Sequence, residues 1–91
     1  MSMTNNQASI TEAAGQVVAA NANRIKVTLR NTGANTVYIG FDASVTSSNG
    51  FTLVANSSLT DSSSLASIYA ICAAGKTSTI SYVEEDLTGV N

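Results

Sequence analysis

Two stretches of the chain alternate apolar and polar residues with a period of two. In RIKVTLRN, positions 24–31, the aliphatic residues are separated by charged or hydroxyl-bearing ones. In TVYIGF, positions 36–41, Val37, Ile39 and Phe41 occupy alternate positions. This period is typical of strands that bury one face. We therefore predict two strands here, with Phe41 on the buried side of the second.

The segment between these strands predicts a tight turn. If both apolar sets share one face, paired residue numbers must sum to an even value, and a three-residue loop satisfies that condition. The loop covers either 32–34 or 33–35, and the second choice places Asn35 in the left-handed conformation that such loops require at their last position. The stretch 30–41 is thus predicted to be a β-hairpin.

Turn and strand signals continue through the middle of the chain. Asn49-Gly50 is the preferred dipeptide of a type I′ turn and has apolar residues on both sides within 45–53. It predicts a second hairpin. The Ser-rich stretch 55–66 is predicted to hold a short strand around Leu59, followed by a loop.

The last third of the chain reads as two more strands. The segment 67–74 is apolar at both parities, as expected of a central strand that is covered on both faces. Alternation returns in 76–84, and Gly75 with Lys76 is predicted to make the turn between the two.

The first twenty residues fit no single pattern. Gly15 interrupts a helical period, and QVVAA at 16–20 suits a strand equally well. We predict a mobile arm over 1–15 and a strand over 16–20. The residues that fit the helical alternative are Ile10, Ala13, Ala14, Val17 and Val18.

Together these elements predict an all-β fold. About five to seven short strands with frequent turns and no clear helix indicate a small antiparallel β-sandwich or barrel, jelly-roll-like, with the mobile N-terminal arm attached. We expect one β domain over 16–91 and no second domain.

Composition points to an assembly component. The chain has 91 residues, so its hydrophobic core is small, and burial of surface against a partner subunit would add stability. Charged residues are 11% of the chain, where a soluble domain has about 25%. Ser, Thr, Asn and Ala replace them and give a neutral surface that is desolvated against a partner at low cost.

Charge and cysteine content exclude further classes of function. Four basic residues and a net charge of −2 argue against nucleic-acid binding. Cys72 is the single cysteine and lies in an apolar run, which predicts a small buried side chain. The start lacks a signal-peptide pattern and no stretch approaches the ~20 apolar residues of a membrane span, so we expect a soluble protein made in the cytosol.

One motif resembles a phosphate-binding loop. AICAAGKT, at 70–77, matches a relaxed Walker A sequence with Ala in the first position. Such loops need a following helix to cradle phosphate, whereas TSTISYV is a strand pattern with few residues after it. We therefore predict no nucleotide site.

The residue types in the chain also exclude other catalytic arrangements. The chain has no His, which removes Ser-His-Asp and Cys-His pairs and imidazole metal ligands. The acidic run 84–86 lacks the spaced ligands of a calcium loop. We predict no catalytic residue, no cofactor and no metal site, and interpret the carboxylates as solvated groups: Asp42, Asp61, Glu84, Glu85 and Asp86.

Basic residues gather on the first strong strand. Arg24, Lys26 and Arg30 would line its outer face at ~6.8 Å per two residues, next to Tyr38 on the neighbouring strand. The stripe could dock an acidic protein surface, or it could keep a solvent face soluble. A third alternative is Arg stacking on Tyr38.

Residues 16–83 resemble a recurrent pattern in small tailed-bacteriophage virion proteins. That pattern has an Asn-x-Asn-Arg entry, an aliphatic strand, Asn-x-Gly, Val-Tyr-Ile-Gly, an Asn-Gly turn and a late aromatic strand. Ala22 stands where such sequences often have Pro, which leaves the entry turn less rigid. The matching residues are Asn21, Asn23, Arg24, Asn31, Gly33, Val37, Tyr38, Gly40, Asn49 and Gly50.

Such proteins are similar to capsid decoration, or cement, proteins and to head- or tail-fibre modules. The resemblance implies β-sandwich subunits, often trimeric, on the outside of the particle. We expect a structural virion protein, made in the bacterial host cytoplasm, that binds the major capsid protein and bridges its subunits. The arm would order on the capsid, with Ile10, Thr11 and Glu12 as candidate contacts.

The alternative is a fibre or adhesin module that binds a host glycan or surface protein. Sugar sites typically use aromatic stacking platforms. The chain has no Trp and three Tyr, which favours the cement interpretation.

Overall fold

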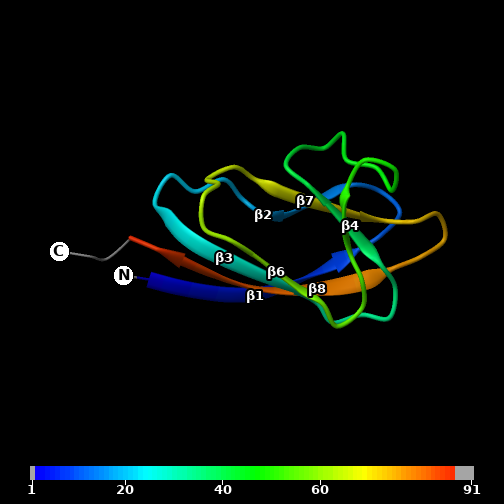
Figure 1. Ribbon diagram of the computed structural model, residues 1–91, viewed down its shortest axis with the longest axis horizontal. Coiled ribbons are helices and arrows are strands. Elements are labelled where there is room, and N and C mark those ends of the chain that lie inside the picture. The colour runs from blue at the N-terminus through cyan, green and yellow to red at the C-terminus, as the bar shows by residue number, and fades with distance from the viewer. Residues whose placement is uncertain (1, 88–91) are drawn as a thin grey trace.

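The structure, a computed structural model, describes residues 2–87 (Figure 1). Within that range it has eight strands, and no helix is long and apolar enough to cross a membrane. The strands are β1 (Ser2–Ile10), β2 (Gly15–Val18), β3 (Arg24–Asn31), β4 (Val37–Gly40), β5 (Phe51–Leu53), β6 (Ser58–Asp61), β7 (Ile68–Cys72) and β8 (Ser78–Asp86).

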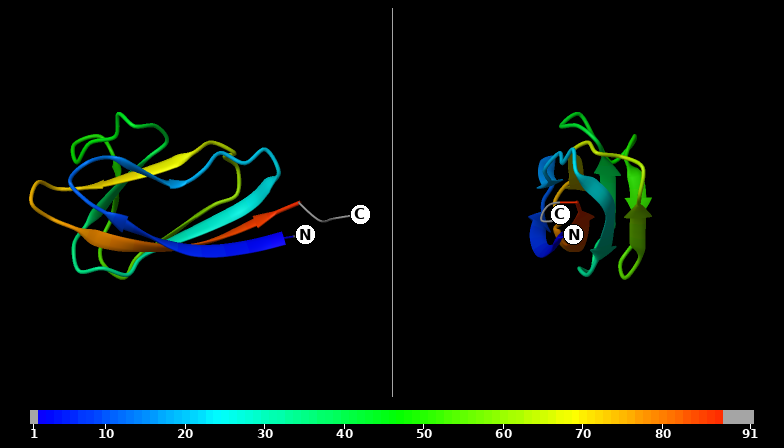
Figure 2. Two further views of the ribbon diagram at one scale, coloured as in Figure 1. Left: turned by 180° about the vertical axis from the view of Figure 1, so that it is seen from behind. Right: turned by 90° about the vertical axis from the view of Figure 1, so that its left-hand side faces the viewer.

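The strands form two four-stranded antiparallel sheets that face each other. One has the order β1-β8-β3-β6 and the other β2-β7-β4-β5. The chain crosses between sheets at each connection except β4–β5, and this strand order is that of a jelly roll. Figure 2 shows the two layers from the end. The predicted all-β sandwich is confirmed, and the barrel alternative is not needed.

The core lies between the sheets and is built from small and medium aliphatic side chains. Alternate residues of the inner strands face it, as the burial of β7 and of β4 shows. Central placement of 67–74 is confirmed by β7, which lies between β2 and β4, but its outer face is only half-buried at Tyr69 and Ile71, so the strand is not covered on both faces. The buried apolar cluster consists of Ile10, Val17, Val18, Val27, Leu29, Val37, Ile39, Leu53, Ile68, Ala70, Cys72 and Ile80.

The predicted hairpin over 30–41 is wrong. β3 lies between β8 and β6 in one sheet, whereas β4 lies between β7 and β5 in the other. The segment between them therefore crosses the sandwich as an arch. The apolar alternation is correct in both strands, but it is satisfied equally by strands that pair side by side and by strands that face each other across a core. Asn35 is accordingly not left-handed, while Asn56 is, with φ 66°.

The mobile arm predicted over 1–15 is also wrong for most of its length. Residues Ser2–Ile10 form β1 and pair with β8 over its whole length, from Ser2 opposite Asp86 to Ile10 opposite Ser78. The sequence hid this strand because its outer positions are polar and its inner positions offer the core little beyond Ile10 and the half-buried Ala8. Met1, and residues 88–91 of the predicted domain, lie outside the described residues.

The second hairpin predicted within 45–53 is wrong, because residues 41–50 form no strand and β5 takes its partner from β4. β4 pairs with β5, with Val37 opposite Leu53, across the loop 41–50. Asn49 has a negative φ, so Asn49-Gly50 is not a type I′ turn. The predicted turn at Gly75 and Lys76 is confirmed, with Gly75 left-handed at φ 76°.

Candidate functional site

The predicted basic stripe does not form a continuous surface. β3 contains a β-bulge at its start: Arg24 pairs with Asp86 and Lys26 with Glu85, so β3 has one extra residue, Ile25, between two successive pairs. The extra residue reverses the parity of the strand start, so Arg24 turns inward and is 6% exposed, while Ile25 is 37% exposed. The alternation in the sequence gave no sign of this reversal.

Arg24 is a structural clamp. Its Nε lies 2.8 Å from Glu84 Oε2, and the side chain of Arg24 is almost fully buried. Its Nη1 donates to the carbonyls of Ser64 and Ala66 at 3.2 and 2.9 Å, and its Nη2 donates to the carbonyl of Ala19 at 2.8 Å. The guanidinium thus ties two segments, the one at Ala19 and the loop 64–66, to β8, and it is not available to a partner.

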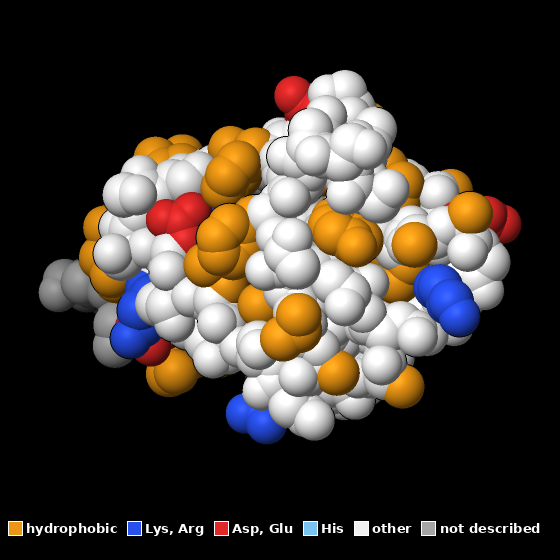
Figure 3. All heavy atoms as spheres, turned by 45° about the vertical axis from the view of Figure 1, so that its right-hand side comes forward, with side chains coloured by type: hydrophobic (Ala, Val, Ile, Leu, Met, Phe, Trp, Pro, Cys, Tyr) orange, Lys and Arg blue, Asp and Glu red, His pale blue; other side chains and the backbone are white. Residues whose placement is uncertain are grey.

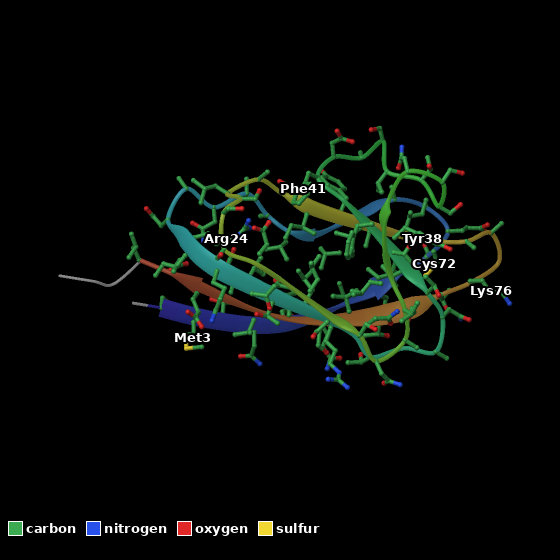
Figure 4. All side chains as sticks on the ribbon, in the orientation of Figure 1. Met3, Arg24, Tyr38, Phe41, Cys72 and Lys76 are labelled. Atoms are coloured by element: carbon green, nitrogen blue, oxygen red, sulfur yellow. The ribbon has the colours of Figure 1, made fainter. Side chains whose placement is uncertain are left out.

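The stripe is reduced to two basic residues, and Tyr38 lies away from both. Lys26 and Arg30 do lie on the outer face of the β1-β8-β3-β6 sheet, on either side of Thr28, as predicted, and Lys26 makes an exposed ion pair with Glu85 at 3.7 Å. Tyr38 is on β4, in the opposite sheet, so it does not neighbour Arg30. Figure 4 shows Arg24 and Tyr38 well separated along the sandwich. Neither a four-residue dock nor Arg stacking on Tyr38 from a neighbouring strand exists.

The Asn-x-Asn-Arg entry builds the corner before β3. The Asn21 side chain donates to Asp86 Oδ2 at 3.1 Å and accepts from the Asn23 amide at 3.0 Å. The Asn21 backbone donates to the carbonyl of Leu65 at 2.9 Å and accepts from the Arg24 amide at 3.1 Å. These bonds join the end of β8 to the chain entering β3, so the motif has a folding role.

The Asn-x-Gly motif builds the arch after β3. Asn31 is fully buried, and its Nδ2 donates to the carbonyls of Asn35 and Leu53 at 2.8 and 2.9 Å. Its Oδ1 accepts from the Gly33 amide at 3.1 Å and from the Ser78 hydroxyl at 2.7 Å. A Cβ at Gly33 would collide with the Ser78 side chain and lie 2.9 Å from its Cα. Both residues hold the crossing between the sheets.

The proposed arm contacts are engaged within the domain. Ile10 is a core residue at 3% exposure. The carbonyl of Thr11 accepts from the Cys72 amide at 2.8 Å, and Glu12 Oε2 accepts from the Gly75 amide at 3.1 Å. They fasten the β1–β2 connection to β7 and to the turn that follows β7.

Cys72 is the buried small side chain that the sequence predicted. It is 2% exposed, its Sγ lies 3.8 Å from the carbonyl oxygen of Ile10, and burial raises the pKa of its thiol. Its thiol is therefore a poor nucleophile at neutral pH. Over residues 2–87, no group of three or more His, Cys, Asp or Glu is arranged to hold a metal ion.

The loop 41–50 contains the Asn-Gly pair of the phage-protein pattern, and Gly40 and Gly50 at its two ends allow it to fold tightly against the sheet. A Cβ at Gly40 would lie 2.6 Å from the Cβ of Val45, which is buried as a plug under the loop. The Thr46 amide donates to Asn49 Oδ1 at 2.7 Å, and the Gly50 amide donates to the Thr46 carbonyl at 2.9 Å. The loop projects from the upper side of the sandwich in Figure 1 and is held by its own hydrogen bonds.

Two exposed phenylalanines flank this loop. Phe41 was predicted to be buried, but it is 53% exposed, and Phe51 at the other end is 58% exposed. Both extend the inward-facing parity of Ile39, since Ile39 pairs with Phe51 and precedes Phe41 by two positions. β4 ends at Gly40, and the other sheet does not cover the rings. The pattern signals an apolar face, but it does not signal where the opposite sheet ends.

The phenylalanines line a hollow of about 500 Å³ beside the loop, together with Asp42, Ser44 and Asn49. The hydroxyl and the amide of Ser44 both donate to Asp42 Oδ1, and these bonds hold the pKa of Asp42 below its ordinary value. The lining side chains include no Lys or Arg. We take this hollow, called the loop cleft below, as the strongest candidate binding site.

A second concave surface lies on the outer face of the β1-β8-β3-β6 sheet. It measures about 600 Å³ and is lined by amide and hydroxyl side chains with one cation, Arg30. Its Tyr82 packs against the core, so the ring offers no stacking surface there. The surface is polar and open, and it resembles ordinary solvated sheet. Its other lining residues are Asn5, Asn6, Gln7, Thr28, Ser81 and Val83.

Comparison with known proteins adds no relative. No protein-family model matches the chain, and no curated protein or solved structure shows significant similarity to it.

Proposed function

We propose that this chain is a structural virion protein that binds the outside of a bacteriophage capsid and stabilises it by bridging capsid subunits. One observation carries the proposal. The side chains with defined polar geometry, such as Arg24 and Asn31, are used to hold the fold, while the surface is mostly neutral. Such a surface suits broad contact with another protein, because little charge has to be desolvated.

The surface also carries exposed apolar side chains. Figure 3 shows them among neutral polar atoms, with few charges between them. Apolar contacts with a neutral rim are what a stable protein interface requires. The jelly roll is a fold of viral capsid and lectin domains, which is an analogy of fold that supports the proposal. The large exposed apolar residues are Met3, Ile25, Phe41, Phe51, Val54, Leu65 and Leu87.

The mechanism needs no chemistry. Each copy adds interface area between neighbouring capsid subunits, and many copies together oppose the outward pressure of packaged DNA. A homotrimer would place three such surfaces around one symmetry axis. Because β1 is paired within the sandwich, the capsid contact is assigned to the folded surface and no longer to a free arm.

The test is sedimentation of the purified protein, alone and mixed with DNA-filled heads or tailless capsids of the source phage. Saturable co-sedimentation, together with a trimer-sized free species, is expected. Copy number follows from the plateau. The control is an unrelated protein of similar size and net charge mixed with the same heads, which separates specific docking from adhesion. If no saturable binding to heads is observed at any head concentration, the proposal is contradicted.

A second function, a fibre or adhesin module that binds host glycan, is favoured by one observation. Phe41 and Phe51 are both exposed beside the hollow, so they offer the aromatic stacking surface that a sugar site typically uses. Binding of labelled protein to host cells or purified tails, with none to heads, would select this function.

A further inference from the structure

The loop cleft has a chemistry of its own: two aromatic rings and one carboxylate. Phe41, Phe51 and Ile39 form the apolar part of the lining, and Asp42 is the single ionisable residue among the lining side chains. Phenyl faces attract cations, because the ring carries negative charge on its faces. An aromatic pair beside a carboxylate is therefore electrostatically matched to a cation with an apolar stem.

Hydrogen bonding within the loop decides between a cation and a sugar. Both Ser44 bonds end on Asp42 Oδ1, which leaves Oδ2 for a ligand. Asn49 is partly engaged, since its Oδ1 accepts from the Thr46 amide and one N–H of its Nδ2 faces the Ser44 carbonyl at 3.5 Å, which leaves few directed partners in the loop. A sugar ring needs several directed partners for its hydroxyls. A cation needs one carboxylate oxygen and a ring face.

We propose that the loop cleft is a docking site for an arginine side chain presented by a partner protein, with the guanidinium on Asp42 and its plane against Phe41 or Phe51. Arginine fits better than lysine because its planar head stacks on aromatic rings and its fork matches a carboxylate. The inference rests on the proposed function, in that the partner is the capsid protein, and it names the contact that anchors the subunit.

The loop suits an anchoring role because it is preorganised. Val45 is buried beneath it, and Gly50 approaches Tyr38 so closely that an added Cβ would lie 2.7 Å from the Tyr38 Cβ. Docking therefore orders few new groups, so little binding free energy is lost to conformational entropy.

The ligand chemistry is tested without any capsid. Isotope-labelled protein is titrated with N-acetyl-arginine amide and followed by amide chemical shifts, with N-acetyl-glutamine amide as the uncharged control. We expect shifts confined to residues 39–51 for the arginine probe, and shifts at least about tenfold smaller in the Asp42→Asn and Phe51→Ala variants. Lys26→Ala, on the opposite sheet, should behave as wild type.

Three results would overturn the inference: no shifts in 39–51, equal shifts with the glutamine probe, or unchanged binding in Asp42→Asn. Shifts with neutral oligosaccharides and none with arginine would also overturn it and assign the cleft to a glycan. Because the variants change exposed side chains, their spectra outside the loop should overlay that of wild type, which verifies that they are folded.

Head binding then separates the inference from the proposed function. If wild type co-sediments with heads and Asp42→Asn/Phe51→Ala binds about 10- to 30-fold more weakly, both stand. If the double variant binds heads as well as wild type, the inference is wrong and the capsid function stands. If wild type binds no heads while the arginine probe shifts 39–51, the cleft chemistry stands and the capsid function is wrong.

Discussion

Arg24 and Lys26 differ by two positions and have opposite roles. Both pair with a glutamate of β8, but Arg24 is enclosed by three carbonyl oxygens and a partly buried carboxylate, whereas Lys26 stays in solvent. Buried ion pairs are costly to break because the remaining partner is left as an uncompensated charge, and exposed pairs contribute little. Burial, and not charge, sets the role of each residue.

The first prediction compares these two residues. Arg24→Ala should lower the free energy of unfolding by about 3–5 kcal/mol, because Glu84 and the carbonyls of Ser64, Ala66 and Ala19 lose their partner. Lys26→Ala should change it by less than about 0.5 kcal/mol. Urea denaturation of both variants measures the difference. Equal losses would show that Arg24 is not the clamp described here.

Asp61 gives a prediction for acid stability. The Ser63 amide lowers the pKa of Asp61 most, burial opposes it, and the Ser64 amide, the Ser63 hydroxyl and the charge of Arg24 keep the net pKa below its ordinary value. A carboxyl with a depressed folded pKa stabilises the protein above its unfolded pKa of about 3.9 and loses that contribution as pH falls through the folded value.

Wild type should therefore lose more stability than Asp61→Asn between about pH 5 and pH 2. The asparagine keeps the side-chain oxygen that accepts from Ser63 and removes the charge. Thermal unfolding at a series of pH values checks this. A constant gap between the two proteins across the range would contradict the assigned pKa shift.

At the scale of elements, β1 is the strand that the sequence concealed. It is an edge strand, paired on one side with β8, and contributes one fully buried apolar side chain, Ile10. Its stability therefore comes mainly from its ladder with β8, and no hydrophobic period marks it.

Hydrogen exchange distinguishes this strand from an arm. We expect about every second amide of 2–10 to exchange at least about a hundredfold more slowly than in a free peptide, because an edge strand bonds through alternate residues. β8 is the internal control, because it is paired on both sides and should protect consecutive amides. Free exchange throughout 2–10, with β8 protected, would restore the mobile arm.

Elements with a strong period were predicted well. β3, β7 and β8 lie where the alternation or the continuous apolar run placed them, and β6 is the short strand expected around Leu59. The failures concern relations between elements. The alternation in 24–31 and 36–41 requires that two apolar faces share a core, and both a hairpin and an arch meet that requirement.

At the scale of the whole molecule, the topology is dominated by pairings between distant segments. β1 pairs with β8, and β3 lies between β8 and β6, so most ladders join residues far apart in sequence. Loop closure must precede these contacts, which makes all-β folds slow to form.

Refolding should accordingly occur on a millisecond-to-second timescale. The chain has no Pro, so the slow phase of tens of seconds that proline isomerisation produces should be absent. Stopped-flow dilution from urea, followed by tyrosine fluorescence, measures both. Microsecond folding would contradict the assigned topology, and a phase of tens of seconds would require another cause, such as subunit assembly.

Local period and residue type were enough to predict the fold class, most strand positions and the burial of Cys72. The candidate site was beyond their reach. Exposure of Phe41 and Phe51 depends on where the opposite sheet ends, and burial of Arg24 depends on a bulge that reverses parity. Both are decided by residues distant in the chain, so only the tertiary structure shows that Arg24 is a buried clamp and that Phe41 and Phe51 line an open cleft.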